Sequence, residues 1–181
     1  MDIFEGQRDM RAGYLSGAPG VLASSLAWAA ATGAAIFMSP QQAVWVLFIG
    51  GMLIHPAGML IGKVLGAPGT HTKANPLAEL AGASTIWMIV CLPLAYVAST
   101  AMIEWFFPAM LLIIGGRYLT FGTLYGMRFY WVLGFALVGA GFGLGVLAPA
   151  PAVSAGVGSA IEFAFAIVGF VLHGRWAKQS A

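Results

Sequence analysis

Residues 115–128 read Gly-Gly-Arg-Tyr-Leu-Thr-Phe-Gly-Thr-Leu-Tyr-Gly-Met-Arg, and the fold has to accommodate the polar side chains of this stretch. It places Arg117, Tyr118 and Tyr125 inside an otherwise apolar run that is long enough to be a helix. A charged side chain at membrane depth persists only when it is paired or reached by water. Arg117 therefore marks a candidate functional site, and its partner has to come from another part of the chain.

The composition places the chain among membrane proteins. Hydrophobic residues make up 60% of its 181 residues and charged residues only 8%, whereas soluble domains carry about 25% charged residues. The net charge of +2 is not gathered on one basic face, so the sequence does not favour binding to nucleic acid. The single cysteine, Cys91, cannot form an internal disulfide and has no metal-ligand spacing around it, so we interpret it as a small core residue.

Apolar runs of roughly the length needed to cross a bilayer recur between short polar breaks. They cover residues 18–38, 42–62, 77–98, 102–124, 130–148 and 153–173. Turn and helix-stop residues separate the runs, among them Ser39-Pro40 and Pro149-Ala150-Pro151. Asn75-Pro76 combines a capping residue with a proline suited to the first helical position. The sequence predicts an all-α integral membrane protein that folds as a six-span transmembrane helical bundle.

The positive charges predict the orientation of this bundle. In the six-span arrangement every Lys and Arg lies at or toward one side, namely Arg8, Arg11, Lys63, Lys73, Arg117, Arg128, Arg175 and Lys178. By the positive-inside rule both termini are then cytoplasmic, and we expect a bacterial inner (plasma) membrane. We divide the chain into a cytoplasmic N-terminal segment, 1–16, a single transmembrane domain, 17–174, and a cytoplasmic tail, 175–181. The first segment forms either an amphipathic helix on the membrane surface or a frayed tail.

Glycine patterns bear on how the helices pack. Ile49-Gly50-Gly51 and Ile114-Gly115-Gly116 are each followed by a basic residue at the same interval, which suggests a bundle built from repeated two-helix hairpins. Chance similarity is the alternative, because such sequences are rich in glycine and alanine. Glycines at small-residue spacing in the second and fifth runs let helix backbones approach closely, either within one protomer or between copies in a homo-oligomer.

Four ionisable side chains lie away from the expected helix ends: His55, Glu79, Arg117 and Glu162. At about 1.5 Å per residue along ideal helices, His55, Arg117 and Glu162 fall near the middle of the bilayer. Arg117 and Glu162 have opposite charges and no partner on their own spans, so we predict that they pair. The hydroxyl group of Tyr118 is available at the same candidate site.

Each of these residues also has a structural interpretation. His55 precedes Pro56, and a neutral imidazole there would bond to a carbonyl freed by the proline. Glu79 lies in the first turn after Asn75-Pro76, where a carboxylate complements the helix N-terminus. Arg117 would instead snorkel to the cytoplasmic interface if its span ended early.

The sequence contains none of the common enzyme motifs, so we predict no catalytic residues, no cofactor and no metal site. Two classes of function remain. The first is a channel or transporter for a small solute or ion, with the mid-membrane polar residues on its path. The second is an accessory or scaffold membrane protein that transports nothing and whose buried charges are structural. The expected partners are the lipid bilayer and, in the first class, the unidentified solute or ion.

Overall fold

The computed structural model describes residues 1–180, and within them every regular element is a helix. In chain order the elements are α1 (Ile3–Tyr14), η1 (Leu15–Gly17), α2 (Ala18–Phe37), α3 (Pro40–Val64), α4 (Leu77–Ala101), η2 (Ile103–Trp105), α5 (Phe106–Tyr125), α6 (Phe129–Leu147) and α7 (Pro151–Ser180). Among the described residues, 6 helical segments are long and apolar enough to cross a membrane, and they contain α2 to α7. The prediction of a six-span helical membrane protein is confirmed.

The helix starts follow the local signals in the sequence. The Ser39 hydroxyl accepts a hydrogen bond from the Gln42 backbone N–H at 3.2 Å, so it caps α3. The Asn75 side chain accepts from the Leu77 backbone N–H at 3.0 Å at the start of α4. At the other end of the chain, α7 continues as a helix to Ser180, so the described part of the predicted tail extends the last helix.

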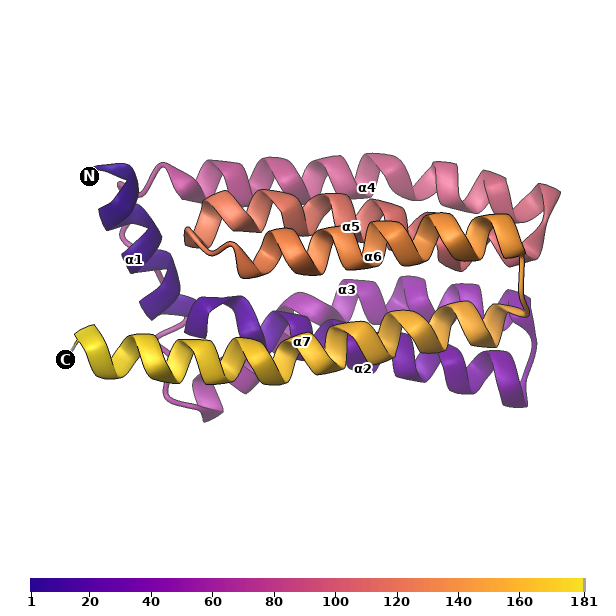
Figure 1. Ribbon diagram of the computed structural model, residues 1–181, viewed down its shortest axis with the longest axis horizontal. Coiled ribbons are helices and arrows are strands. Elements are labelled where there is room, and N and C mark those ends of the chain that lie inside the picture. The colour runs from indigo at the N-terminus through magenta and orange to yellow at the C-terminus, as the bar shows by residue number, and fades with distance from the viewer. Residues whose placement is uncertain (181) are drawn as a thin grey trace.

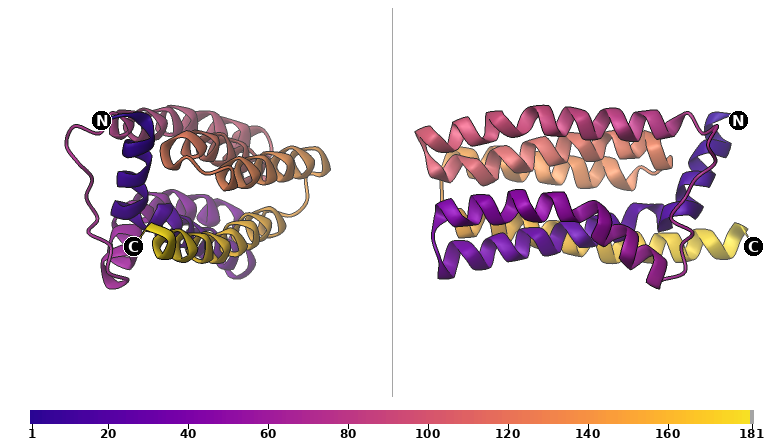
Figure 2. Two further views of the ribbon diagram at one scale, coloured as in Figure 1. Left: turned by 60° about the vertical axis from the view of Figure 1, so that its left-hand side comes forward. Right: turned by 180° about the vertical axis from the view of Figure 1, so that it is seen from behind.

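The bundle consists of two layers (Figures 1 and 2). In one layer α2 packs closely against α3 and α7, and in the other α5 packs closely against α4 and α6. Because α2 and α5 are the middle helices of their layers, they carry the largest buried shares of the six spans. Aromatic side chains fill the space between the layers: Phe106 and Phe107 pack edge to face at 5.0 Å, and Trp28 lies 6.0 Å from Phe107.

The layers bear on the predicted hairpin repeat. Helices α2 and α3 pack as one hairpin and α4 and α5 as another, in line with the two predicted copies. Helices α6 and α7, by contrast, lie in different layers (Figure 1). The bundle is therefore better described as two layers than as three equal hairpins, and a repeat in the sequence stays a prediction.

Helix α1 lies across one end of the bundle, where both chain termini are found (Figures 1 and 2). It is a capped helix, because the Asp2 carboxylate accepts from the Glu5 N–H and the Glu5 carboxylate accepts from the Asp2 N–H. Gly6, Met10 and Gly13 form its buried face. Residues 3–14 are thus not a frayed tail, and their buried face is covered by the bundle itself.

Polar contacts fasten α1 to the loop before α4 and to the end of α5. The Asp9 carboxylate accepts from the Thr72 backbone N–H at 2.9 Å and from the Asn75 side chain at 2.8 Å. Burial alone would raise the pKa of the Asp9 carboxyl, but the hydrogen bonds from Asn75 and Thr72 outweigh it and hold that pKa below its ordinary value. The Arg11 guanidinium donates to the backbone carbonyls of Tyr125 and Gly126, just where α5 ends.

Candidate functional site

The Glu162 carboxyl group lies at the centre of the bundle. Its side chain is 0% exposed, and neither carboxylate oxygen has a hydrogen-bonding partner in good geometry among the described residues. The hydroxyl groups of Ser24, on α2, and Tyr118, on α5, are close enough to interact with it. Glu162 thus faces both the neighbouring helix of its own layer and the middle helix of the other layer.

A close approach of α7 to the interior brings the carboxyl group to this position. Gly158 lies one turn before Glu162 and therefore on the same face of α7. A β-carbon at Gly158 would lie 2.9 Å from atoms of both Trp28 and Leu111. A side chain at this position could be accommodated only if Trp28 and Leu111 shifted, so the absence of one lets α7 lie close to α2 and α5.

Arg117 is oriented toward α4. Its Nη2 donates to the Thr85 hydroxyl at 3.1 Å and its Nη1 to the Met88 sulfur at 3.6 Å. The guanidinium carbon lies 5.2 Å from the centre of the Phe121 ring, in cation–π range. The Nε atom is buried and has no hydrogen-bonding partner among the described residues.

The predicted direct contact between Arg117 and Glu162 is therefore not made, because no hydrogen bond joins the two side chains. Helix geometry gives the reason. Consecutive residues on an α-helix point in directions about 100° apart, and Tyr118 occupies the direction that leads to α2 and α7. Arg117, one position earlier, is left facing α4, and it interacts with Glu162 only through longer-range electrostatics.

The structure brings Tyr118 and Glu162 together and leaves two other predicted site residues apart. His55 lies on an exposed face of α3. Glu79 is exposed in the first turn of α4, at the end of the bundle where α1 lies, as its capping interpretation expects. Neither residue contributes to the buried cluster around Glu162 in this conformation.

A column of polar side chains that the sequence interpretation missed leads from Tyr118 toward the α1 end. The Tyr130 ring stacks on the Tyr118 ring at 6.0 Å, and the Tyr130 hydroxyl donates to the Ser16 carbonyl. The Ser16 hydroxyl lies 2.9 Å from Nδ1 of His173, whose side chain is half-buried. Ser16 and His173 are 157 residues apart in the chain, so no local pattern could have connected them.

The turn before α2 makes room for this column. Gly17 has a φ of +82°, and a β-carbon there would lie 2.4 Å from the Tyr130 hydroxyl. Ser16, just before it, also has a positive φ of 54° and is 2% exposed. A non-glycine residue rarely adopts that conformation, so packing against Tyr130 and His173 has to hold it.

Two further buried polar atoms lie on the other side of Glu162, toward the end of the bundle opposite α1. They are Nε1 of Trp28 and the Ser154 hydroxyl, and neither has a hydrogen-bonding partner among the described residues. Trp28 lies one turn beyond Ser24 on α2, and Ser154 lies two turns before Glu162 on α7. Together with the Tyr118 column, they extend a row of polar groups along most of the interior. We call this row the polar row. Its members are Ser154, Trp28, Ser24, Glu162, Tyr118, Tyr130, Ser16 and His173.

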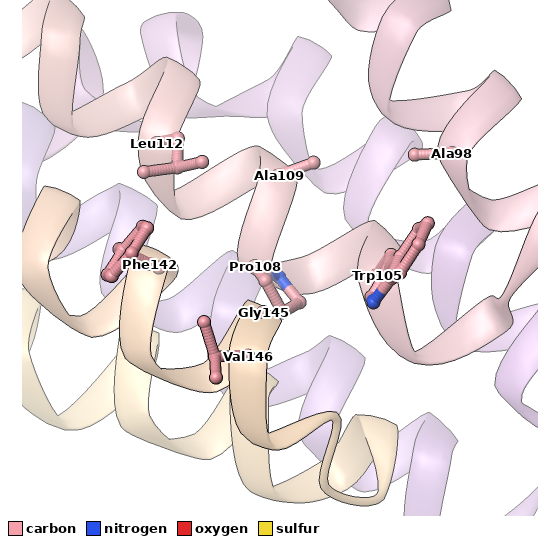
Figure 3. A pocket seen from close by; sticks show the side chains of 9 residues that line it. Ala98, Trp105, Pro108, Ala109, Leu112, Phe142, Gly145 and Val146 are labelled. Atoms are coloured by element: carbon pink, nitrogen blue, oxygen red, sulfur yellow. The ribbon is translucent and has the colours of Figure 1, made fainter.

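Two open grooves on the bundle surface lie away from the polar row. The first lies between α4, α5 and α6, and its lining is apolar, including Trp105, Leu112 and Phe142 (Figure 3). The second lies between α3 and α4, and Trp45 and Tyr96 help to line it. The described residues contain no cluster of three or more histidine, cysteine or carboxylate side chains that could hold a metal ion.

Comparisons with known proteins bear on the whole chain. No curated protein and no solved structure gave a significant match. A family model matches residues 3–172, which include α2 to α6 and most of α7, the polar row up to its last member among them. The chain is therefore a member of the family described as "Family of unknown function (DUF7010)".

Proposed function

We propose that this protein is a membrane channel or transporter that moves a small solute or ion between its two helical layers, with Glu162 and Tyr118 on the path. The observation that carries the proposal is the polar row, which contains buried groups whose hydrogen-bonding capacity is not filled. A buried polar group without a partner costs about 1–3 kcal/mol. Such a row lowers the stability of the fold. Its presence is explained if these groups bind water or solute in another conformation.

The layered architecture supplies a route to that second conformation. Within each layer the middle helix packs closely against both of its neighbours, and between the layers large side chains such as Trp28 and Phe107 are in contact. Transporters with sites at the membrane midplane commonly work by rocking one helical unit against another. We assign the present structure to a closed state, in which aromatic side chains fill the path between the layers.

We also propose the orientation and surroundings that the sequence predicts. The end of the bundle that carries α1 and both termini would face the cytoplasm, because the basic loops and helix ends gather there. Large apolar side chains are exposed along the spans, among them Met52, Trp87 and Phe142, and they would contact lipid. A homo-oligomer through glycine-bearing helix faces would cover part of this surface.

The experiment is a flux assay in proteoliposomes. Small neutral solutes are followed by osmotic light scattering, and protons by a pH-sensitive dye inside the vesicles. We expect flux in the wild type and its loss in Glu162→Gln. Glu79→Gln is the matched control, because Glu79 is an exposed carboxylate away from the row, and it should retain full flux.

The alternative to this proposal is an accessory or scaffold role. It would follow if the folded wild-type protein carried none of these probes. It would also follow if Glu162→Gln transported as well as Glu79→Gln, since the buried carboxyl group would then have no part in transport.

A further inference from the structure

We infer that α1 acts as a latch, which holds the two layers together at the end of the bundle that it covers and has to release α5 before the interior can open there. The first layer is α2, α3 and α7, and the second is α4, α5 and α6. Helix α1 continues into α2 through residues 15–17 and lies across both layers (Figures 1 and 2). The inference rests on the proposed function, because it takes the layers as units that move relative to each other.

The Arg11 side chain contacts both layers. Its Nε donates to the Tyr125 carbonyl and its Nη2 to the Gly126 carbonyl, the latter at 2.6 Å. Carbonyls at the C-terminal end of a helix have no partners within the helix, and a positive charge is favourable there. The same guanidinium lies 5.8 Å from the ring centre of Trp176 on α7, in cation–π range. One side chain of α1 therefore links the end of α5 to α7.

Other groups on α1 bind the second layer in the same region. The Gln7 side chain, one turn before Arg11 and so on the same face, donates to the Thr123 carbonyl of α5 at 2.8 Å. On the adjacent face, the Gly6 carbonyl accepts from the Asn75 side chain at 3.0 Å, and that side chain also caps the start of α4. Helix α1 is thus bonded to the end of α5 and to the cap of α4.

The connection between α1 and α2 allows α1 to move as a unit. Leu15, Ser16 and Gly17 all have positive φ angles, of 49°, 54° and 82°. The helix is therefore interrupted at these residues, and α1 can turn relative to α2 through changes in a few torsion angles. Helix α1 also has its own capping box, so its first turn does not depend on the bundle for its hydrogen bonds.

The contacts that would have to break are of a kind that can be remade. Those of Gln7 and Arg11 to α5 are hydrogen bonds to backbone carbonyls at one end of the bundle, on the side that we expect to be cytoplasmic. Water there can replace each bond that α1 gives up, so the net cost of release is small. The layers can separate at this end only after these contacts are lost, and the present structure is the latched state.

The test measures cysteine labelling by a small, water-soluble methanethiosulfonate reagent on the purified protein in detergent. The first reporter is Ser24→Cys in a Cys91→Ala background. Ser24 is 3% exposed and lies about 9 Å past the start of α2, so its thiol reacts only when the interior opens. The second reporter is the native Cys91, which is buried on α4 beyond its midpoint and reports unfolding of the bundle. Each rate is divided by that of the same thiol in denatured protein.

Arg11→Met should raise the labelling rate at Ser24→Cys at least about tenfold, because the rate follows the fraction of molecules that are open and charge-assisted bonds have been removed. Ser24→Cys should still react at least about tenfold faster than Cys91 in that variant, because opening at this end precedes unfolding. Arg8→Met is the matched control, since Arg8 is an exposed arginine on the same helix, and it should label as the parent does. Gln7→Leu, which loses one neutral hydrogen bond, should give a smaller rise.

Three results would overturn the latch. The first is a rate at Ser24→Cys that stays unchanged in both Arg11→Met and Gln7→Leu. The second is equal labelling of Ser24→Cys and Cys91 in Arg11→Met, because the opening would then be unfolding of the whole bundle. The third is a rise in Arg8→Met as large as in Arg11→Met, because loss of charge rather than loss of the contact to α5 would explain it.

These rates are independent of flux, so the latch and the proposed transport can fail separately. The expected labelling pattern in a protein that carries no solute would support the latch and overturn transport. Flux through a protein whose labelling does not respond to Arg11→Met or Gln7→Leu would support transport and overturn the latch.

Discussion

The end of the bundle that α1 covers and the interior each contain an arginine and a carboxyl group. The two regions differ in whether these groups have hydrogen-bonding partners. Arg11 and Asp9, at the α1 end, each have at least two hydrogen-bonding partners. In the interior, one guanidinium nitrogen of Arg117 and both oxygens of Glu162 have none among the described residues. The hydrogen-bonded groups at the end therefore stabilise the fold, whereas the buried atoms without partners in the interior lower its stability.

The largest expected effect separates the two arginines. Arg11→Met should lower the free energy of unfolding by about 2–3 kcal/mol, because it removes charge-assisted hydrogen bonds to the end of α5. Arg117→Met should be neutral or stabilising by about 1–2 kcal/mol, because an apolar side chain of similar length needs no partners there. Denaturation of both variants in the same detergent measures the difference. If Arg117→Met lost as much as Arg11→Met, the interior charge would be structural, and the accessory role would gain support.

A smaller effect is expected from the carboxylate at the α1 end. Asp9→Asn should lower stability by about 1 kcal/mol at neutral pH, because the amide is a weaker acceptor for Thr72 and Asn75. The pKa of Asp9 is lowered from its ordinary value of 3.8, so its contribution is present at neutral pH and is lost as the pH falls through the folded-state pKa. The stabilities of wild type and variant should therefore begin to converge as the pH falls below about 4, and they should be equal once the pH is below the folded-state pKa.

The pH dependence of unfolding, measured for both proteins in one buffer series, tests this expectation. A difference between Asp9→Asn and the wild type that stayed constant into acid would show that the charge on Asp9 does not fasten α1.

The smallest effect is expected at the interior carboxyl group. Glu162→Gln should change stability by less than about 1 kcal/mol, because an amide of nearly the same shape replaces a carboxyl group whose oxygens have no hydrogen-bonding partner among the described residues. Combined with Arg117→Met, it should be additive within about 0.5 kcal/mol, since the two side chains share no hydrogen bond. A coupling well above that value in a double-mutant cycle would show that the two charges form a pair after all.

Much of the fold could be predicted from local signals. The six apolar runs lie within a few residues of α2 to α6 and of the first two-thirds of α7, because the length of an apolar run is a property of neighbouring residues. Asn75 was identified as a helix-start signal, but its amide also binds Asp9 and the Gly6 carbonyl of α1, which no local pattern reveals. The sequence predicts the end of this last helix too early, because its polar last turns resemble a tail in sequence and are helical in the structure.

Composition and spacing are enough to predict a six-span helical protein and to identify Arg117, Tyr118 and Glu162 as candidates for a buried site, because they fix helix lengths and approximate depths. Which of these side chains meet follows from the tertiary structure. Whether two side chains touch depends on the direction in which each points around its helix and on how closely the helices pack. The 100° between Arg117 and Tyr118 sends one to α4 and the other to Glu162. The missing β-carbon at Gly158 lets α7 come close enough for that contact.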